Sequence, residues 1–194
     1  MVIVIGITGA TGVIYGIRLL EVLAGRENIE THLVISKAAA DIIEFETGRT
    51  PEDVRRLADN SWDIRDLSAP VSSGSFRTGG MIVAPCTVKT MSAIAHSYDE
   101  NLIVRAADVT LKERRKLVLA VRETPLHLGH LRSMTRLTEM GAVILPPVPA
   151  FYTRPESIRD IIDYTVGKML DTFDIEHNLF QRWSGHAAGI EIDD

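Results

Sequence analysis

The chain has 194 residues, of which 45% are hydrophobic and 24% are charged. This composition is ordinary for a globular protein and argues against a disordered, collagen-like or repeat-built chain, while the length favours one domain. The 26 acidic and 21 basic residues give a formal charge of -5, which offers no general attraction to nucleic acid or to an anionic membrane. The single cysteine, Cys86, permits no intramolecular disulfide, so a reducing, cytoplasmic location is expected.

Buried strands alternate with helices along the chain. The apolar run Val2–Ile7 lacks the basic start of a signal peptide and meets glycine too early to span a membrane, so it is predicted as the first strand. The same patterns predict strands at 31–36, 80–84, 116–121 and 142–145, and helices at 13–23, 37–47, 88–95, 126–140 and 156–173. This alternation predicts a doubly wound, mostly parallel α/β sheet of the Rossmann-like or flavodoxin-like kind.

Two stretches are predicted to lie outside these elements. Residues 60–78 are rich in Ser, Gly and Pro, which indicates a long surface loop with at most one short strand. Residues from about 174 form a C-terminal extension of the single domain, which is expected to span 1–194. No internal repeat or linker divides the chain.

A glycine loop, GITGATG, joins the first strand to the first helix. Its small residues let backbone N–H groups and a helix N-terminus approach a phosphate. A dinucleotide-binding domain would next place Asp or Glu at the end of the second strand, where this chain has Ser36 and Lys37. The missing acid favours a mononucleotide such as FMN, while Lys37 leaves NADP open. The alternative is a glycine turn that serves close packing only.

Two further strand ends carry polar residues. The segment PCTVKT opens a helix, so Thr87 and Thr90 can offer hydroxyls to a phosphate or a ring edge, although Thr87 also suits an N-cap. No base accompanies Cys86 in the sequence, which favours a buried structural thiol over a nucleophile. Arg122 and Glu123 end the next strand and suit an anion clamp beside an acid-base group, or else a surface ion pair.

Three other clusters of charged or histidine residues are not predicted to form binding sites. The basic run 112–116 lies between a helix and a buried strand, which indicates a solvated helix end. His127 and His130 lack a third ligand at a convincing spacing. Asp160 and Asp163 lack the Asp-rich pattern that holds Mg²⁺ for a diphosphate. No metal site is therefore predicted.

The UbiX-type flavin prenyltransferases, once labelled aromatic acid decarboxylases, are the family that this chain resembles. The likeness rests on GITGATG, ISKAA with the following FET, PCTVKT, NLIVRAADVTLKERRKLVLAVRETP, GAVILPPVPAFY and QRW, in order along nearly the whole chain. It implies a metal-independent transfer of the dimethylallyl group from dimethylallyl phosphate to N5 and C6 of reduced FMN. The product, prenylated FMN, would serve UbiD-type decarboxylases. The resemblance also implies a homo-oligomer, a dodecamer.

The resemblance assigns residues to two sets. It implies FMN contacts for Gly9, Ala10, Thr11, Ser36, Thr87, Val88, Lys89, Thr90 and Arg122. It implies positions around the prenyl phosphate and the reacting flavin edge for Glu46, Lys112, Glu123, Tyr152 and Lys168. Lys112, Tyr152 and Lys168 would form the phosphate clamp, and the catalytic group would comprise Glu123 as proton carrier with Glu46 and Lys112. Lys168 stands where many members have Arg, which keeps the charge but loses bidentate phosphate recognition.

Two alternatives stay open. An FMN-dependent cysteine decarboxylase of the same fold would oxidise a peptidyl cysteine, but that group uses a catalytic His near the first helix and another motif in place of PCTVKT. A non-catalytic FMN-binding subunit is the second alternative. Formation of prenylated flavin from reduced FMN and dimethylallyl phosphate would distinguish the prenyltransferase from both.

Overall fold

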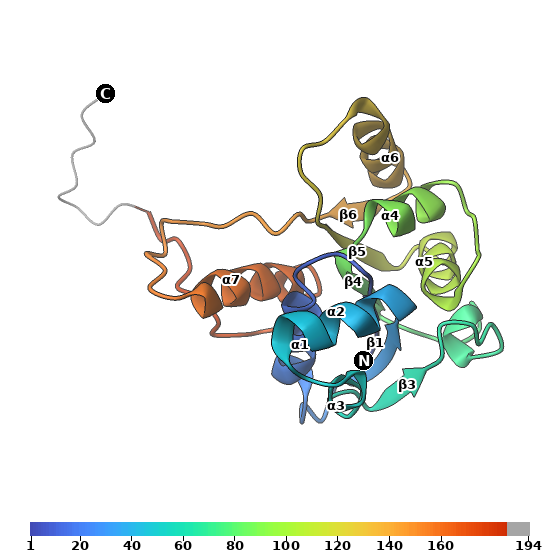
Figure 1. Cartoon of the computed structure of the whole chain (residues 1–194), viewed down its shortest axis with the longest axis horizontal. Coiled ribbons are helices and arrows are strands. Elements are labelled where there is room, and N and C mark those ends of the chain that lie inside the picture. Colours follow the sequence, from blue (N-terminus) through green and yellow to red (C-terminus); the bar gives the residue numbers. More distant parts are fainter. Residues whose placement is uncertain (186–194) are drawn as a thin grey trace.

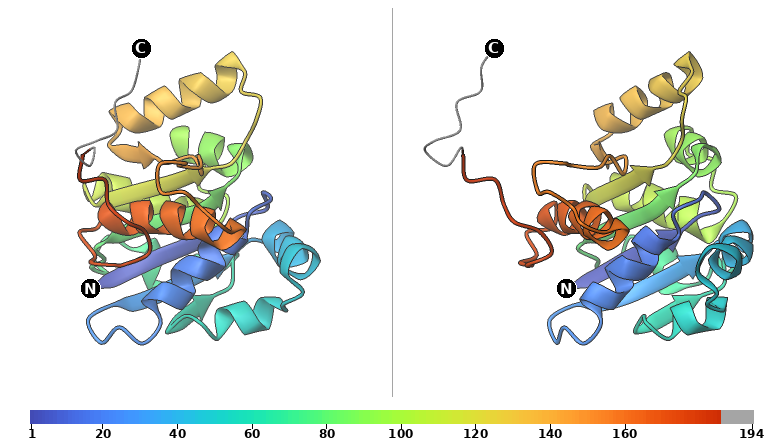
Figure 2. Two further views of the ribbon diagram at one scale, coloured as in Figure 1. Left: turned by 90° about the vertical axis from the view of Figure 1, so that its left-hand side faces the viewer. Right: turned by 60° about the vertical axis from the view of Figure 1, so that its left-hand side comes forward.

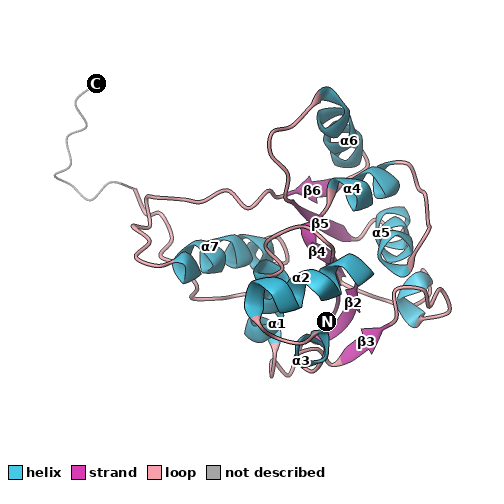
Figure 3. Cartoon of the chain, viewed as in Figure 1, coloured by secondary structure: helices cyan, strands magenta, loops and turns pink. Residues whose placement is uncertain are grey.

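A computed structural model describes residues 1–185, within which six parallel strands form one sheet (Figures 1 and 3). The strand order is β3-β2-β1-β4-β5-β6, so the direction of winding reverses between β1 and β4. The predicted doubly wound α/β class is confirmed. The strands are β1 (Val2–Ile7), β2 (Glu30–Ile35), β3 (Asn60–Trp62), β4 (Gly80–Cys86), β5 (Lys116–Val121) and β6 (Ala142–Ile144).

All five predicted helices appear, two of them with the predicted ends (37–47 and 88–95) and three with ends shifted by one or two residues. The helices of the described chain are α1 (Ile14–Leu23), α2 (Lys37–Thr47), α3 (Pro51–Arg55), α4 (Val88–Ala95), α5 (Leu102–Lys112), α6 (Leu128–Glu139) and α7 (Ile158–Asp171), with a 3-10 turn at Pro70–Ser72. Helix α6 begins two residues later than predicted because His127 is its N-cap, with Nδ1 accepting the N–H of Gly129 at 3.0 Å. The predicted short strand within 60–78 is β3. No helix in residues 1–185 combines the length and apolar character needed to cross a membrane.

The helices cover both faces of the sheet. Side chains alternate along β1, so Ile3, Ile5 and Ile7 pack with α1, α2 and α7, whereas Val4 packs with α4 and α5 on the other face. Figure 2 shows α7 beside α1 on the first face. Because strands buried on both faces need apolar residues throughout, they appear in the sequence as continuous apolar runs.

The chain after α7 turns back along that helix (Figures 1 and 2). This part begins the predicted C-terminal extension, of which residues 186–194 lie outside the described residues. The assignment of 1–194 to a single domain stays a prediction. The carboxyl ends of the parallel strands meet at one edge of the sheet, where the loops after β1, β2, β4 and β5 converge.

Candidate active site

A cleft of about 1060 Å³ opens at the carboxyl edge of the sheet, where β1 and β4 end. All nine residues predicted to contact FMN line it, and Glu123 does as well. The sheet topology therefore brings together residues that lie as far apart in the sequence as Gly9 and Arg122. Their contact with FMN stays a prediction. The further lining residues with polar side chains are Thr8, Lys37, Asp41, Arg65, Glu100 and Asn101.

Thr8 ties the loop after β1 to the loop after β4. It is only 2% exposed, and its Oγ1 donates to the carbonyl of Pro85 at 2.8 Å while accepting the N–H of Thr87 at 2.8 Å. The N–H of Thr8 donates to the same Pro85 carbonyl at 3.2 Å. These bonds fix the glycine loop against the start of α4. Nothing in the sequence distinguishes Thr8, because one threonine among glycines has no characteristic spacing.

Close packing explains one glycine of the loop, Gly9, and one of helix α1, Gly16. A Cβ at Gly9 would lie 2.4 Å from the Cβ of Ala38, and a Cβ at Gly16 would lie 2.2 Å from the Ala84 carbonyl oxygen. Neither position can take a larger residue without moving α2 or the end of β4. Gly9 therefore has a packing role in addition to its place in the cleft wall.

Three helix N-termini face the cleft. Ser36, Thr87 and Asn101 cap α2, α4 and α5, each accepting a first-turn backbone N–H at 3.1 Å. The N-cap interpretation of Thr87 is thus confirmed, and its hydroxyl also donates to Oγ1 of Thr90 at 3.0 Å. Helix N-termini, a loop of small residues and the cation of Arg122 are the features that hold a phosphate. The donor set and the size of the cleft suit a phosphorylated flavin.

The two acidic candidates approach the cleft from different elements. Glu123 is half-buried, and its Oε1 accepts the N–H of Thr124 at 3.0 Å. Glu46 reaches the glycine loop from α2, where its Oε2 accepts the N–H of Gly12 at 2.9 Å. Glu46 does not line the cleft wall itself but holds the loop that does.

Cys86, the last residue of β4, is fully buried, and its burial raises the pKa of the thiol to about 12. The thiol therefore stays protonated at neutral pH and cannot act as a thiolate nucleophile. The predicted burial of the thiol is confirmed.

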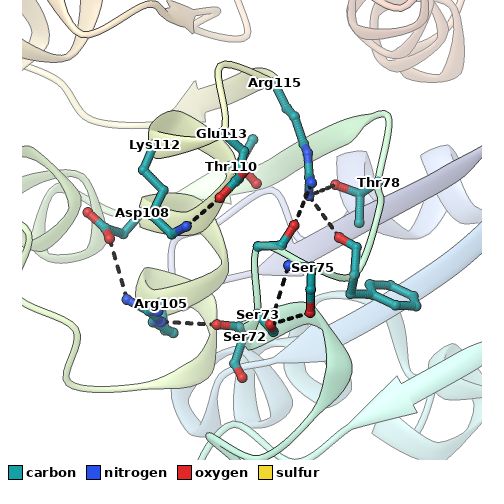
Figure 4. Close-up of polar contacts among 12 residues, drawn as sticks. Ser72, Ser73, Ser75, Thr78, Arg105, Asp108, Thr110, Lys112, Glu113 and Arg115 are labelled. Atoms are coloured by element: carbon teal, nitrogen blue, oxygen red, sulfur yellow. Dashed lines mark hydrogen bonds and ion pairs between the residues drawn. The ribbon is translucent and has the colours of Figure 1, made fainter.

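Lys112 lies at the opposite edge of the sheet from the cleft. It ends α5, whose first turn faces the cleft, and a helix of 11 residues separates its ends by roughly 16 Å. Its ammonium group pairs with Glu113 beside the loop 72–78, which Arg105 and Arg115 hold through bonds to backbone carbonyls (Figure 4). The structure does not bring Lys112 to the cleft of its own chain.

Tyr152 and Lys168 belong to a second group, the α7 cluster, which comprises Tyr152, Tyr164, Lys168, Asp171 and Arg182. The Tyr152 ring meets that of Tyr164 edge to face at 6.0 Å between centroids. Partial burial, followed by a hydrogen bond with Tyr164, raises the pKa of Tyr152, and the charges of Lys168 and Arg182 oppose this rise. The protonated hydroxyl can donate to a phosphate oxygen. Neither Tyr152 nor Lys168 lines the cleft of its own chain.

The remaining candidate clusters have structural contacts. Asp160 forms a capping box with Ser157 at the start of α7, and Asp163 binds Arg18 of α1 at 2.6 Å. Among residues 1–185, no group of three or more His, Cys, Asp or Glu side chains is arranged to hold a metal ion.

Close relatives match nearly the whole chain. The family model described as Flavoprotein matches residues 1–184. Flavin prenyltransferase UbiX of Escherichia coli K12 is 57% identical over 185 residues, covering 94% of this chain and 98% of that protein. Flavin prenyltransferase UbiX of Thauera aromatica is also 57% identical, covering 96% of this chain and 95% of that protein.

Solved structures agree with these matches. AnUbiX (PadA1) in complex with FMN and dimethylallyl pyrophosphate superposes with a TM-score of 0.93 at 55% identity, covering 96% of this chain and 98% of that one. A dodecameric FMN-dependent UbiX-like decarboxylase from Escherichia coli O157:H7 gives a TM-score of 0.94 at 50% identity, covering 95% of this chain and all of that one. The FMN-dependent cysteine decarboxylase TvaF shares only 15% identity at a TM-score of 0.59, a likeness of fold alone. The chain belongs to the flavoprotein family and, within it, to the UbiX flavin prenyltransferases.

Proposed function

We propose that this protein transfers the dimethylallyl group of dimethylallyl phosphate to N5 and C6 of reduced FMN. The prenylated FMN then serves as the cofactor of a UbiD-type decarboxylase. The observation that carries this proposal is the 57% identity with a UbiX flavin prenyltransferase over 94% of the chain. The cleft supports it, because every residue implied to contact FMN lies in its wall. The lone, buried thiol of Cys86 is compatible with the reducing cytoplasm, where we place the protein.

The residues divide the chemistry between them. Departure of phosphate from an allylic carbon leaves negative charge on the leaving oxygens, which cations and a tyrosine hydroxyl stabilise in the transition state. Lys112, Lys168 and Tyr152 supply these groups. Reduced FMN supplies the electron-rich ring, and the cleft residues bind it, orient it and exclude water. Closure of the new ring moves a proton from the ring carbon C6 to the alkene carbon of the attached prenyl group, and Glu123 carries that proton.

The phosphate clamp is completed where subunits meet. Lys112 lies at the far edge of the sheet, and Tyr152 and Lys168 lie on the α7 cluster, so none of them lines the cleft of its own chain. Rotational symmetry brings different surfaces of neighbouring subunits together, and the UbiX-like relative forms a dodecamer. Phe151 and Ile158, beside the cluster, are 71% and 78% exposed and would be covered by such a contact.

The test is to mix the protein with reduced FMN and dimethylallyl phosphate without oxygen and to follow flavin absorbance and mass. A flavin whose mass has increased by one dimethylallyl unit is the expected product. Dimethylallyl alcohol, which lacks the leaving phosphate, is the control and should give none. Binding of FMN without any product would favour the non-catalytic subunit. Loss of CO₂ from a peptide ending in cysteine would favour the cysteine decarboxylase.

A further inference from the structure

The chain that follows α7 is fastened to the helix through the carboxylate of Asp171. Its Oδ1 accepts a hydrogen bond from Nη2 of Arg182 at 2.6 Å and lies 3.1 Å from Nε2 of His177. Its Oδ2 accepts from Nη1 of Arg182 at 3.2 Å and from Nζ of Lys168 at 3.4 Å. One carboxylate therefore binds two cations, and it binds Arg182 with both oxygens, the geometry that fixes a guanidinium most firmly.

His177 is the buried partner of Asp171. Its side chain is 1% exposed, and its Nδ1 accepts the N–H of Leu179 at 3.3 Å. Because Nδ1 accepts, the ring N–H that faces Asp171 is the one on Nε2, which donates to the carboxylate. A Cβ at Gly167 would lie 2.6 Å from Cε1 of His177 and 2.5 Å from Cε1 of Phe180, so glycine is needed for the segment to lie against α7.

The docked segment places Arg182 beside the candidate phosphate ligands. The ring of Trp183 meets that of Tyr152 edge to face at 5.6 Å. The side chains of Arg182 and Lys168 are 59% and 47% exposed, whereas that of Asp171 is 20% exposed. Two accessible cations thus share a surface with the Tyr152 hydroxyl, and the carboxylate that orients them is the least exposed of the three ionic groups.

We propose that Arg182 is a further phosphate-binding residue for the prenyl donor and that Asp171 is the positioning residue that holds Arg182 and Lys168 for it. This inference rests on the proposed function, which assigns Tyr152 and Lys168 to the donor. Nη1 and Nη2 of Arg182 each give one N–H to Asp171, so the Nε–H and the adjacent outer Nη N–H of the planar guanidinium are the two parallel donors for phosphate oxygens, which the ammonium group of Lys168 lacks.

Neutralising Asp171 distinguishes its orientation of Arg182 and Lys168 from its effect on the net charge of the cluster. Asp171→Asn makes the cluster more positive, so an effect of charge alone would tighten binding of dimethylallyl phosphate. Positioning predicts the reverse, because Arg182 and Lys168 lose the acceptor that orients them. Burial tends to raise the pKa of Asp171, but hydrogen bonds from Arg182 and His177 hold it below its usual range, so the carboxylate is charged at neutral pH.

The experiment measures kcat, KM for dimethylallyl phosphate, and FMN affinity for the wild type, Asp171→Asn, Arg182→Ala and Arg182→Lys. Arg182→Ala should raise KM about ten-fold to a hundred-fold, as expected for loss of a hydrogen bond to a charged group. Arg182→Lys should recover part of this loss, and Asp171→Asn should raise KM about ten-fold with a smaller change in kcat. FMN affinity should not change. Arg159→Ala is the matched control, because this α7 arginine is 64% exposed and pairs with Asp163.

Binding is also measured by calorimetry on protein loaded with oxidised FMN, which tests the same contacts without turnover. Unchanged KM and unchanged donor binding in Arg182→Ala would overturn the assignment of Arg182. Tighter donor binding in Asp171→Asn would overturn the positioning role. Wild-type protein that binds the donor through Arg182 but makes no product would instead refute the proposed function. If Asp171→Asn fails to fold, the variants of the exposed Arg182 side chain still decide whether Arg182 binds the phosphate of the donor.

Discussion

Thr8→Val removes the link between the two loops that form the cleft. Valine has the shape of threonine but lacks the hydroxyl, so the bond donated to the Pro85 carbonyl and the bond accepted from the Thr87 N–H are both lost. The Pro85 carbonyl keeps its bond from the Thr8 N–H, whereas the Thr87 N–H keeps no partner among the described contacts of residues 1–185.

The expected cost follows from this asymmetry. Loss of the donated bond costs about 1 kcal/mol, and the unpaired N–H of half-buried Thr87 costs up to about 1–3 kcal/mol more. We therefore expect the free energy of unfolding to fall by about 2–4 kcal/mol. FMN should bind roughly ten-fold more weakly, equivalent to about 1.4 kcal/mol, because the glycine loop and the start of α4 no longer hold a fixed relative position.

The assay is urea unfolding without FMN, since bound ligand would itself add stability, together with fluorescence titration of FMN. Thr31→Val is the matched control. Thr31 is also 2% exposed, and its hydroxyl also donates one bond and accepts one, both with Asp59, far from the cleft. This control should lose stability but keep its FMN affinity. Equal weakening of FMN binding in both variants, or in neither, would refute the proposed role of Thr8.

Three further outcomes follow from the contacts described. Lys168→Ala should reduce use of dimethylallyl phosphate about ten-fold to a hundred-fold without weakening FMN binding, and Lys168→Arg should preserve or improve turnover; steady-state kinetics and FMN titration measure both. Glu123→Gln should bind FMN normally yet complete the fourth ring about 10²–10⁴-fold more slowly, as seen by mass spectrometry over time; wild-type rates would exclude Glu123 as the base. Bonds from the backbone and then the hydroxyl of Thr31 lower the pKa of Asp59, so the stabilisation it provides should disappear as the pH falls below the ordinary value of 3.8. Unfolding of wild type and Asp59→Asn should therefore converge in acid, and a constant difference would contradict this.

The sequence was informative where burial on both faces demands continuous apolar residues. The run Val2–Ile7 has the same ends in the structure as predicted, and so does the run Lys116–Val121. Helix α3 was not predicted, because 5 residues are too few to show helical periodicity. Its signal was local: Thr50 and Asp53 form a capping box around Pro51 at the first helical position.

The residues of the cleft likewise divide into those that the sequence predicted and those that it did not. Residues at strand ends were found because parallel topology gathers strand ends at one edge, which places Ser36, Thr87 and Arg122 in one cleft. Asn101 was missed because it begins a helix that follows no strand directly. The place of Lys112 was not predictable from the sequence, since its distance from the cleft depends on the length and direction of α5.

This separation leads to a last prediction, on hybrid assemblies. If Lys112 acts in the cleft of a neighbouring subunit, Lys112→Ala impairs the sites of other chains, whereas Glu123→Gln impairs the cleft of its own chain. Co-expressing the two variants in equal amounts places an intact cleft beside an intact lysine in roughly a quarter of the sites of a symmetric assembly. The hybrids should then exceed the activity of either variant alone, with size-exclusion chromatography confirming equal assembly. If both residues serve the same cleft from one chain, co-expression restores no activity above that of the single variants. That result would refute a site shared between subunits.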